Sequence, residues 1–321
     1  MTEVHETPAE GYAPLRLLHE SVVRSEEIDA LGHMNVRFYG ARALASTDRL
    51  LAELGVDADD FRAAVAVVHD LPCLFTRYHH EQHTGSSLEV RGGLVRVSED
   101  GVRLYHELRN PEQDELAASF VHDIRFRVPG EDTPLLLPSS VLKELSRSIS
   151  KIPEAGRPRT IDLDGAPVAP SLSEALESGL AFRMPRRVEA DNCDGEGRLS
   201  AEMRPFYMWG GDPIPPEKLA DGPSLIPLAD GGKMGWASME TRSVMVQQPV
   251  AGMRIQAFAA TVELARKTNM RRYWVFDLDT QNLLLSNEVV ELALHLGQRR
   301  AIEIPAAIRE EMLKNLRDDL R

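Results

Sequence analysis

The chain has 321 residues, of which 43% are hydrophobic and 27% are charged. This length and apolar content are sufficient for two domains of ordinary size, each with its own core. The formal net charge is −13 at pH 7, which excludes the basic footprint typical of non-specific nucleic-acid binding, so no nucleic-acid partner is expected.

The first regular elements are a strand and a helix joined by a turn. Leu17–Arg24 has an extended, partly alternating pattern, and Val36–Leu54 is rich in helix formers and stops before Gly55, a residue type that favours the position after a helix. Asn35 is a good candidate for the residue that caps this helix. The unpaired amides and partial positive charge of a helix start can stabilise an oxygen that becomes anionic.

Extended segments follow this helix, separated by turn signals. Ala63–Val68 opens the β-rich region, and the strands that we predict lie near Leu71–Gln82, Ser86–Val97, Val102–Asn110 and Leu116–Val128. A strand, a long helix and several antiparallel strands form an α+β order in which a sheet can wrap the helix.

A group of histidines near the end of the first of these strands was considered as a metal site. On a strand, residues 79, 81 and 83 share one face. A second cluster of ligands is lacking, so an exposed polar strand face is the better interpretation. We therefore expect no metal and no cofactor.

The turn before the helix reads D-x-x-G-H-M-N-x-x-x-Y from Asp29 to Tyr39. Taken singly, an Asp before a glycine turn is ordinary turn chemistry, and a His after Gly is more often structural than catalytic. The ordered set, however, resembles the active-site turn of hotdog-fold acyl thioesterases of the hydroxybenzoyl-CoA thioesterase type. Members of this family hydrolyse thioesters of coenzyme A or acyl carrier protein.

The resemblance implies a role for each residue of the motif. Asp29 is expected to act as the nucleophile or as the base that activates water, while the backbone from Gly32 to Asn35 polarises the thioester carbonyl. His33 and Asn35 match positions that are catalytic or substrate-orienting in some branches of the family. The resemblance further places Gly32, Met34 and Tyr39 at the substrate.

The sequence repeats itself after the Pro-rich residues 151–180. Val188–Ser200 aligns without a gap with Val23–Asn35, so that Asp194 falls on Asp29 at an offset of 165 (194 − 29). Gly252 and Pro305 correspond to Gly85 and Pro138 at an offset of 167 (252 − 85 and 305 − 138). Nearly constant offsets indicate a tandem duplication. We add Asp194 to the expected substrate-binding residues.

The predicted fold class is therefore α+β, with two hotdog domains in tandem, each an antiparallel sheet wrapped around a central helix. The domains are placed at residues 12–150 and 181–321, with residues 151–180 as the linker. Hotdog domains usually pair, so the chain is expected to be its own pseudo-dimer, and a further homodimer is left open.

The second copy departs from the motif, since Arg198, Leu199 and Ser200 replace the His, Met and Asn. Pro205 falls inside its expected helix, which must be shortened or start late. The insertion Trp209–Pro227 either lines a cleft or is a surface loop. Strands resume in four segments, predicted at Lys233–Gln247, Arg254–Arg266, Met270–Asp279 and Leu283–His295.

Three functions were weighed on this scaffold. No G-x-S-x-G elbow, P-loop, dinucleotide-binding glycine pattern or H-E-x-x-H occurs, which disfavours serine esterases, nucleotidases and typical redox enzymes. Hydrolysis of an acyl-CoA or acyl carrier protein thioester ranks first, and a non-hydrolytic acyl-CoA-binding or regulatory protein is the alternative. A hydratase acting on enoyl-CoA ranks third, because the hydratase branch of the fold uses a different Asp/His motif, which is not found in this sequence.

The compartment was inferred from cysteines and apolar runs. Cys73 and Cys193 are far apart and suggest neither a disulfide framework nor a zinc site. Residues 1–11 lack an apolar signal core, and no run is long enough to cross a bilayer. These features predict a cytoplasmic protein without a membrane partner.

Overall fold

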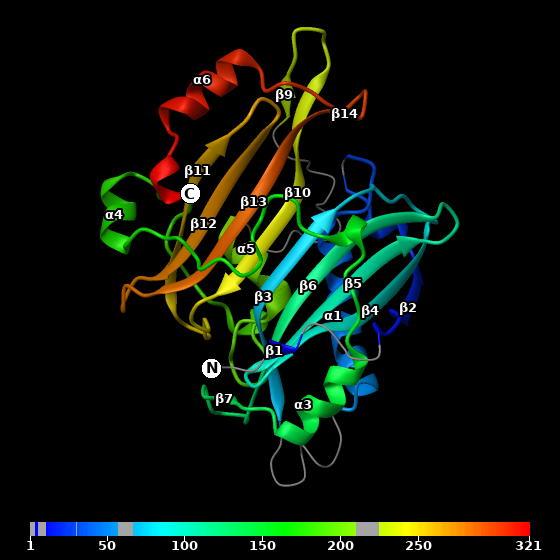
Figure 1. The fold of residues 1–321 in the computed structure, drawn as a ribbon. Coiled ribbons are helices and arrows are strands. Elements are labelled where there is room, and N and C mark those ends of the chain that lie inside the picture. Colours follow the sequence, from blue (N-terminus) through cyan, green and yellow to red (C-terminus); the bar gives the residue numbers. More distant parts are fainter. Residues whose placement is uncertain (1–3, 6–10, 30, 57–66, 210–224) are drawn as a thin grey trace. The chain divides into compact units, whose positions relative to one another are not determined.

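A computed structural model of the chain describes residues 4–5, 11–29, 31–56, 67–209 and 225–321 (Figure 1). The chain divides into two compact units, one of residues 1–28 and 33–157 and the other of residues 29–32 and 158–321. The domain boundaries proposed at residues 150 and 180 stay a prediction. Within the described part of the chain, no helix combines the length and apolar character that a membrane crossing requires.

The first unit is built on an antiparallel sheet with the strand order β1-β4-β5-β6-β3, in which β2 also pairs with β4 and β7 with β6. The strands are β1 Val4–His5, β2 Arg16–Val22, β3 Val68–Tyr78, β4 Ser87–Ser98, β5 Gly101–Asn110, β6 Glu115–Arg127 and β7 Pro134–Leu135. The four long strands predicted after the helix are confirmed to within a few residues. The predicted start of the β-rich region at Ala63–Val68 lies largely outside the described residues.

The strand β3 ends earlier than predicted, at Tyr78. The segment from His79 to His83 is therefore a loop, and the interpretation of residues 79, 81 and 83 as one strand face is wrong. His79 and His80 instead bond to groups at the start of β6: His79 Nε2 lies 3.2 Å from Ser119 Oγ and His80 Nδ1 lies 3.1 Å from Leu116 O.

The helix α1, Val36–Glu53, packs against the sheet of the first unit (Figure 1). Its buried residues recur at helical spacing along one side: Tyr39, Ala43, Ser46, Thr47, Leu50 and Leu51. The helix stops at Leu54, and Gly55 follows in the left-handed region with φ +74°. A shorter helix, α3 Ser139–Leu145, follows the strands of this unit.

Two imidazoles are buried beneath α1. Thr47 Oγ1 lies 3.3 Å from Nε2 of His106 on β5 and 3.0 Å from Nδ1 of His122 on β6. Burial lowers the pKa of His106 to about 3, because a charged imidazole would lose its hydration. Burial, with His106 beside it, also holds the pKa of His122 well below its ordinary value. Both histidines are therefore neutral at neutral pH.

An ion pair fastens α1 to the segment that precedes the Asp29 turn. Nη2 of Arg42 donates to both carboxylate oxygens of Glu27, at 3.0 and 2.8 Å, and the two side chains are only 10% and 12% exposed. Glu27 also accepts from the amide of Arg24 at 3.0 Å, which closes the short η1 turn, Ser25–Glu27. The pair thus ties the approach to the turn to the body of the helix.

Replacing Arg42 by leucine is expected to lower the free energy of unfolding by about 3 kcal/mol, because it leaves the Glu27 carboxylate poorly solvated and unpaired. Urea denaturation measures this change. The matched control is Arg147→Leu, whose partner Glu144 is exposed, and which should change stability by less than about 1 kcal/mol. Equal effects of the two substitutions would contradict the role of the Glu27–Arg42 pair.

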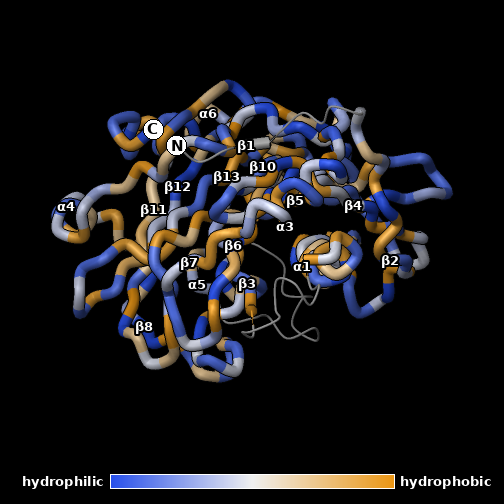
Figure 2. Tube along the Cα trace, turned by 60° about the horizontal axis from the view of Figure 1, so that its bottom comes forward, coloured by the Kyte–Doolittle hydropathy of each residue, from blue (hydrophilic) through white to orange (hydrophobic). Residues whose placement is uncertain are grey.

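The second unit repeats the architecture of the first with the strand order β10-β13-β12-β11-β8, in which β9 also pairs with β10 and β14 with β13. The strands are β8 Arg186–Arg187, β9 Ile226–Pro227, β10 Lys233–Met245, β11 Arg254–Leu264, β12 Thr268–Asp277, β13 Leu283–His295 and β14 Arg300–Ala301. The four long ones agree with the predicted strands. Figure 2 shows hydrophobic and hydrophilic residues alternating along strands of both units, as expected for sheets with two different faces.

The helix of the second unit starts late, as Pro205 predicted. The turn η5, Ala201–Met203, stands where α1 begins in the first unit, and α5, Arg204–Trp209, follows it. Pro205 lies in the first turn of α5, where its missing amide hydrogen breaks no helical bond. Residues 210–224 of the predicted insertion lie outside the described residues. The last α-helix of this unit is α6, Ala306–Lys314.

Backbone geometry supports the duplication read from the sequence. Gly32 and Gly197 both adopt left-handed φ values, +83° and +75°, as the same turn requires. The antiparallel bridges Ile28↔Met34 and Cys193↔Leu199 flank these turns at the same offset of 165 (193 − 28 and 199 − 34). The correspondence therefore extends from residue types to hydrogen bonding.

The inner faces of the two sheets differ in chemistry. In the first unit, Leu104 and Ile124 belong to the apolar cluster that includes Leu50 of α1. In the second unit, the pairs Asn269↔Glu291 and Tyr273↔Asn287 fall on the face that packs against α5.

The predicted linker packs closely on the second sheet. The carboxylate of Glu240 on β10 accepts the amides of Arg159, Thr160 and Ile161 at 2.7 to 3.1 Å. The indole nitrogen of Trp274 donates to Val168 O at 2.9 Å. One short helix, α4 Leu172–Glu177, is capped by Ser171. Residues 159–168 are therefore held by the strands of the second unit, which includes the chain from residue 158 onward.

Candidate active site

The turn that carries Asp29 is stabilised by its own side chain. Oδ1 of Asp29 accepts the amide of Leu31 at 2.9 Å, and the amide of Gly32 donates to Asp29 O at 2.9 Å. This is the hydrogen bonding of an Asx turn. Nη2 of Arg299 also donates to Leu31 O at 2.6 Å, within the unit that includes residues 29–32.

The backbone amides proposed to polarise a thioester are mostly engaged. The amide of Gly32 donates to Asp29 O, that of Met34 to Gln82 O at 2.7 Å, and that of Asn35 to Glu27 O at 2.9 Å. An amide that is bonded to a main-chain carbonyl cannot also hold an oxyanion without moving. These three amides therefore have main-chain acceptors in the structure, and the role expected of the segment from Gly32 to Asn35 stays a prediction.

Asn35 caps α1, as predicted. Its Oδ1 accepts the amide of Arg37 at 3.1 Å, and its carbonyl accepts the amide of Phe38 at 3.0 Å. The side-chain bond satisfies one of the amides that a helix start leaves without an intrahelical partner. Asn35 therefore has a structural function, whatever further part it takes in chemistry.

His33 faces a carboxylate that sequence reasoning did not assign to the site. Its Nε2 lies 3.5 Å from Oε1 of Glu81, and its Nδ1 lies 3.3 Å from Met34 O. The His33 side chain is 15% exposed and that of Glu81 is 37% exposed, so the pair is within reach of solvent. A His–carboxylate pair of this kind can fix which ring nitrogen carries the proton. In the sequence, Glu81 stands out only as a member of the histidine-rich segment that was set aside as a metal site.

Met34 and Tyr39, both expected at the substrate, are buried. Met34 is 0% exposed, and Tyr39 is 3% exposed. The Tyr39 hydroxyl donates to His80 O at 3.3 Å and accepts the amide of Gln82 at 3.0 Å. Burial and these hydrogen bonds let both residues support the turn and the loop, and their place at the substrate stays a prediction.

The second copy keeps the Asp turn and loses the rest. Oδ1 of Asp194 accepts the amides of Glu196 and Arg198, both at 2.9 Å. Ser200 Oγ donates to Asn192 O at 3.0 Å and does not cap the following turn. The same Asx bond occurs in both copies, so an Asp at this position has a structural reason in each turn. A catalytic role for it depends on the residues around it.

Arginines of the second half could bind the phosphates of a coenzyme A ester, and the structure gives several of them other partners. Arg186 stacks over the ring of Tyr207 at 4.4 Å, and Arg271 stacks over that of Tyr273 at 5.0 Å. Arg272 pairs with Glu288 at 2.8 Å, in a buried position. None of these three is a simple exposed charge.

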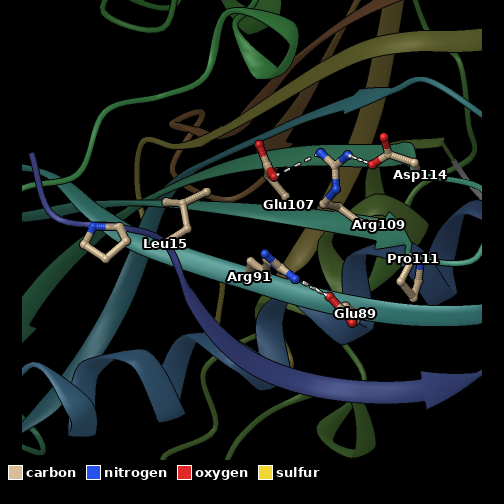
Figure 3. A pocket seen from close by; sticks show the side chains of 8 residues that line it. Leu15, Glu89, Arg91, Glu107, Arg109, Pro111 and Asp114 are labelled. Carbon is tan, nitrogen blue, oxygen red and sulfur yellow. Dashed lines mark hydrogen bonds and ion pairs between the residues drawn. The ribbon is translucent and has the colours of Figure 1, made fainter.

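A cavity of about 480 Å³ opens on the first unit, on the outer face of β4 and β5 (Figure 3). Arg91 donates twice to Glu89, at 2.9 and 3.1 Å, while Arg109 lies between Glu107 and Asp114 at 3.5 and 3.1 Å. Both arginines of the lining are therefore neutralised by neighbouring carboxylates. The lining contains none of the motif residues, so we do not assign the site to it.

Comparisons with known proteins agree with this fold. Residues 23–145 match the family model described as Thioesterase-like superfamily. No curated protein matches the sequence significantly. An acyl-ACP thioesterase from Bacteroides thetaiotaomicron is 11% identical with a TM-score of 0.59, and 86% of this chain covers 97% of that one.

A second similar structure is that of the 12:0-ACP thioesterase from Umbellularia californica. It is 9% identical, its TM-score is 0.60, and 87% of this chain covers 94% of that one. Both likenesses extend over the two halves of the chain. The predicted fold class is therefore confirmed: the chain consists of two hotdog domains in tandem, and its first half has the sequence features of the thioesterase-like superfamily.

Proposed function

We propose that the protein hydrolyses the thioester of an acyl group with coenzyme A or acyl carrier protein, giving the free acid and a thiol. The observation that carries the proposal is the pairing of His33 with Glu81 directly before the N-terminus of α1, in the motif that Asp29 begins. The match of residues 23–145 to a thioesterase-like family supports it. The two similar structures are both named as acyl-ACP thioesterases, which favours the carrier protein as one source of the thioester.

In the proposed reaction, the Asp29 carboxylate either accepts a proton from an attacking water or adds to the thioester carbonyl itself. Collapse of the tetrahedral intermediate breaks the bond between carbon and sulfur, and the sulfur takes up a proton and leaves as the thiol. Where Asp29 itself has added to the carbonyl, the acyl group is left on Asp29 as a mixed anhydride, and attack of a water on this anhydride gives the free acid and restores the carboxylate. His33, oriented by Glu81, is placed to exchange that proton. The partial positive charge at the first turn of α1 stabilises the oxyanion, since the amides of Gly32, Met34 and Asn35 have other acceptors.

Release of free thiol from a panel of acyl-CoA and acyl carrier protein esters tests the proposal. Turnover by the full chain that rises with enzyme concentration and saturates with ester is the expected result. Saturable binding of the same esters without thiol release would favour the alternative, a non-hydrolytic binding or regulatory protein.

A further inference from the structure

The backbone around Glu81 is held on both sides by one hydroxyl group. Tyr39 Oη donates to His80 O at 3.3 Å and accepts the amide of Gln82 at 3.0 Å, so its two partners are the residues before and after Glu81. Tyr39 lies on α1, one turn beyond the cap residue Asn35, and is 3% exposed. The hydroxyl thus links the helix to the loop at a point where β3 has already ended.

Gln82 fixes the same loop from two further directions. Its carbonyl accepts the amide of Met34 at 2.7 Å, which joins the loop to the residue after His33. Its Oε1 accepts Nδ2 of Asn110, at the end of β5, at 3.0 Å. Gln82 is 1% exposed, so these bonds lie away from competing water. The backbone of the loop is therefore held at both residues that flank Glu81.

The contact between His33 and Glu81 needs such support. At 3.5 Å and with Glu81 partly exposed, the attraction of the pair is weak, and a long carboxylate side chain loses rotamer freedom when it is held in one place. We propose, building on the thioesterase function proposed above, that Tyr39 is a positioning residue: its hydroxyl sets the backbone at Glu81 so that the carboxylate meets Nε2 of His33. Tyr39 then acts on the reaction through Glu81 and His33 without touching the substrate.

The test is Tyr39→Phe, which removes one oxygen and keeps the ring in the core. We expect kcat for thiol release to fall about tenfold, equivalent to one misplaced hydrogen bond, with KM changed by less than about twofold. The pH profile of kcat should move in the same direction as that of Glu81→Gln. Added to Glu81→Gln, the substitution should give no further loss, because its effect passes through that carboxylate.

The matched control is Tyr207→Phe in the second unit. Tyr207 is 1% exposed, and its hydroxyl also has two partners, accepting the amide of Glu189 at 2.9 Å and Nδ2 of Asn192 at 2.8 Å. It should lower the thermal midpoint as much as Tyr39→Phe does, and leave kcat and its pH profile unchanged. A purely structural role of Tyr39 would make the two variants alike in every readout.

A nuclear magnetic resonance titration of His33 gives a readout that does not depend on turnover. The His33 ring signals should shift in Tyr39→Phe toward those of Glu81→Gln and stay as in the wild type in Tyr207→Phe. Unchanged His33 signals and an unchanged kcat in folded Tyr39→Phe would overturn the inference, while loss of activity in Glu81→Gln would leave the proposed function standing. A wild-type chain that released no thiol from any ester would remove the function and the inference together.

Discussion

Asp29→Asn is expected to fold normally and to lose about 10²- to 10⁴-fold in the rate of thiol release, the range that general-base assistance contributes. Asparagine keeps a side-chain oxygen that can accept the Leu31 amide, now bonded at 2.9 Å, so the Asx turn should survive. It can neither attack a carbonyl nor take a proton from water. Steady-state kinetics and circular dichroism on the same sample measure the two effects.

The repeat supplies a matched control for this substitution. Asp194 makes the same bond to the amide two residues on, also at 2.9 Å, and lacks a His and an Asn counterpart after it. Asp194→Asn therefore tests what replacing the carboxylate by a side-chain amide does to a turn of this geometry. Any change in the kinetics of this variant should appear mainly in KM. Affinity for acyl-CoA should persist in Asp29→Asn, since a carboxylate near an anionic ligand only repels it.

Two outcomes would contradict this assignment. Hydrolysis at nearly the wild-type rate in folded Asp29→Asn would contradict the proposed mechanism and favour the alternative, a non-hydrolytic binding protein. If Asp194→Asn lost turnover while Asp29→Asn kept it, the reaction would take place in the second repeat instead. The two variants therefore separate the function from its location.

Local signals in the sequence were sufficient to predict most of the fold. Left-handed glycines such as Gly55 and Gly85 mark turns by a rule of backbone geometry, and long strands show their alternation directly. Pro205 indicated correctly that the second helix starts late, because the absence of its amide hydrogen has the same effect in any tertiary context. These features depend on residues close together in the chain.

The parts that could not be predicted depend on partners far apart in the chain. The loop that carries Glu81 leaves β3 because Tyr39 and Met34 bind its backbone, and no pattern within residues 78–83 contains that information. Similarly, the Pro-rich stretch was predicted as a linker because its packing depends on the carboxylate of Glu240, some 80 residues later. Turn chemistry could be read from the sequence, whereas the pairing that gives His33 its carboxylate required the structure.

Acid is expected to destabilise the first unit through the two histidines beneath α1. In the unfolded chain each imidazole has a pKa near 6.5, while burial lowers the folded pKa of His106 to about 3 and holds that of His122 well below its ordinary value. Below pH 6.5 the unfolded state thus binds protons that the folded state does not. Stability is fully present above pH 6.5 and is lost as the pH falls toward 3.

The expected loss is large on the scale of a domain's stability. Between pH 7.5 and pH 5, His106 should lower the free energy of unfolding by about 2 kcal/mol, a figure set by the unfolded pKa because the folded pKa of about 3 lies below this window. His122 should add a loss of the same sign, because its folded pKa is also lowered. Urea denaturation at the two pH values measures it. The double variant His106→Gln/His122→Asn retains polar atoms for Thr47 and has no imidazole to protonate, so the loss of stability between the two pH values should be smaller than in the wild type by about 2 kcal/mol or more.

His19→Gln provides the control, because His19 is exposed on β2. That variant should keep the pH dependence of the wild type. The double variant is expected to be less stable than the wild type at pH 7.5, since neither amide fills the space of an imidazole ring. The diagnostic feature of the double variant is a weaker dependence of the free energy of unfolding on pH. If the double variant lost as much stability in acid as the wild type does, other groups would bind the protons.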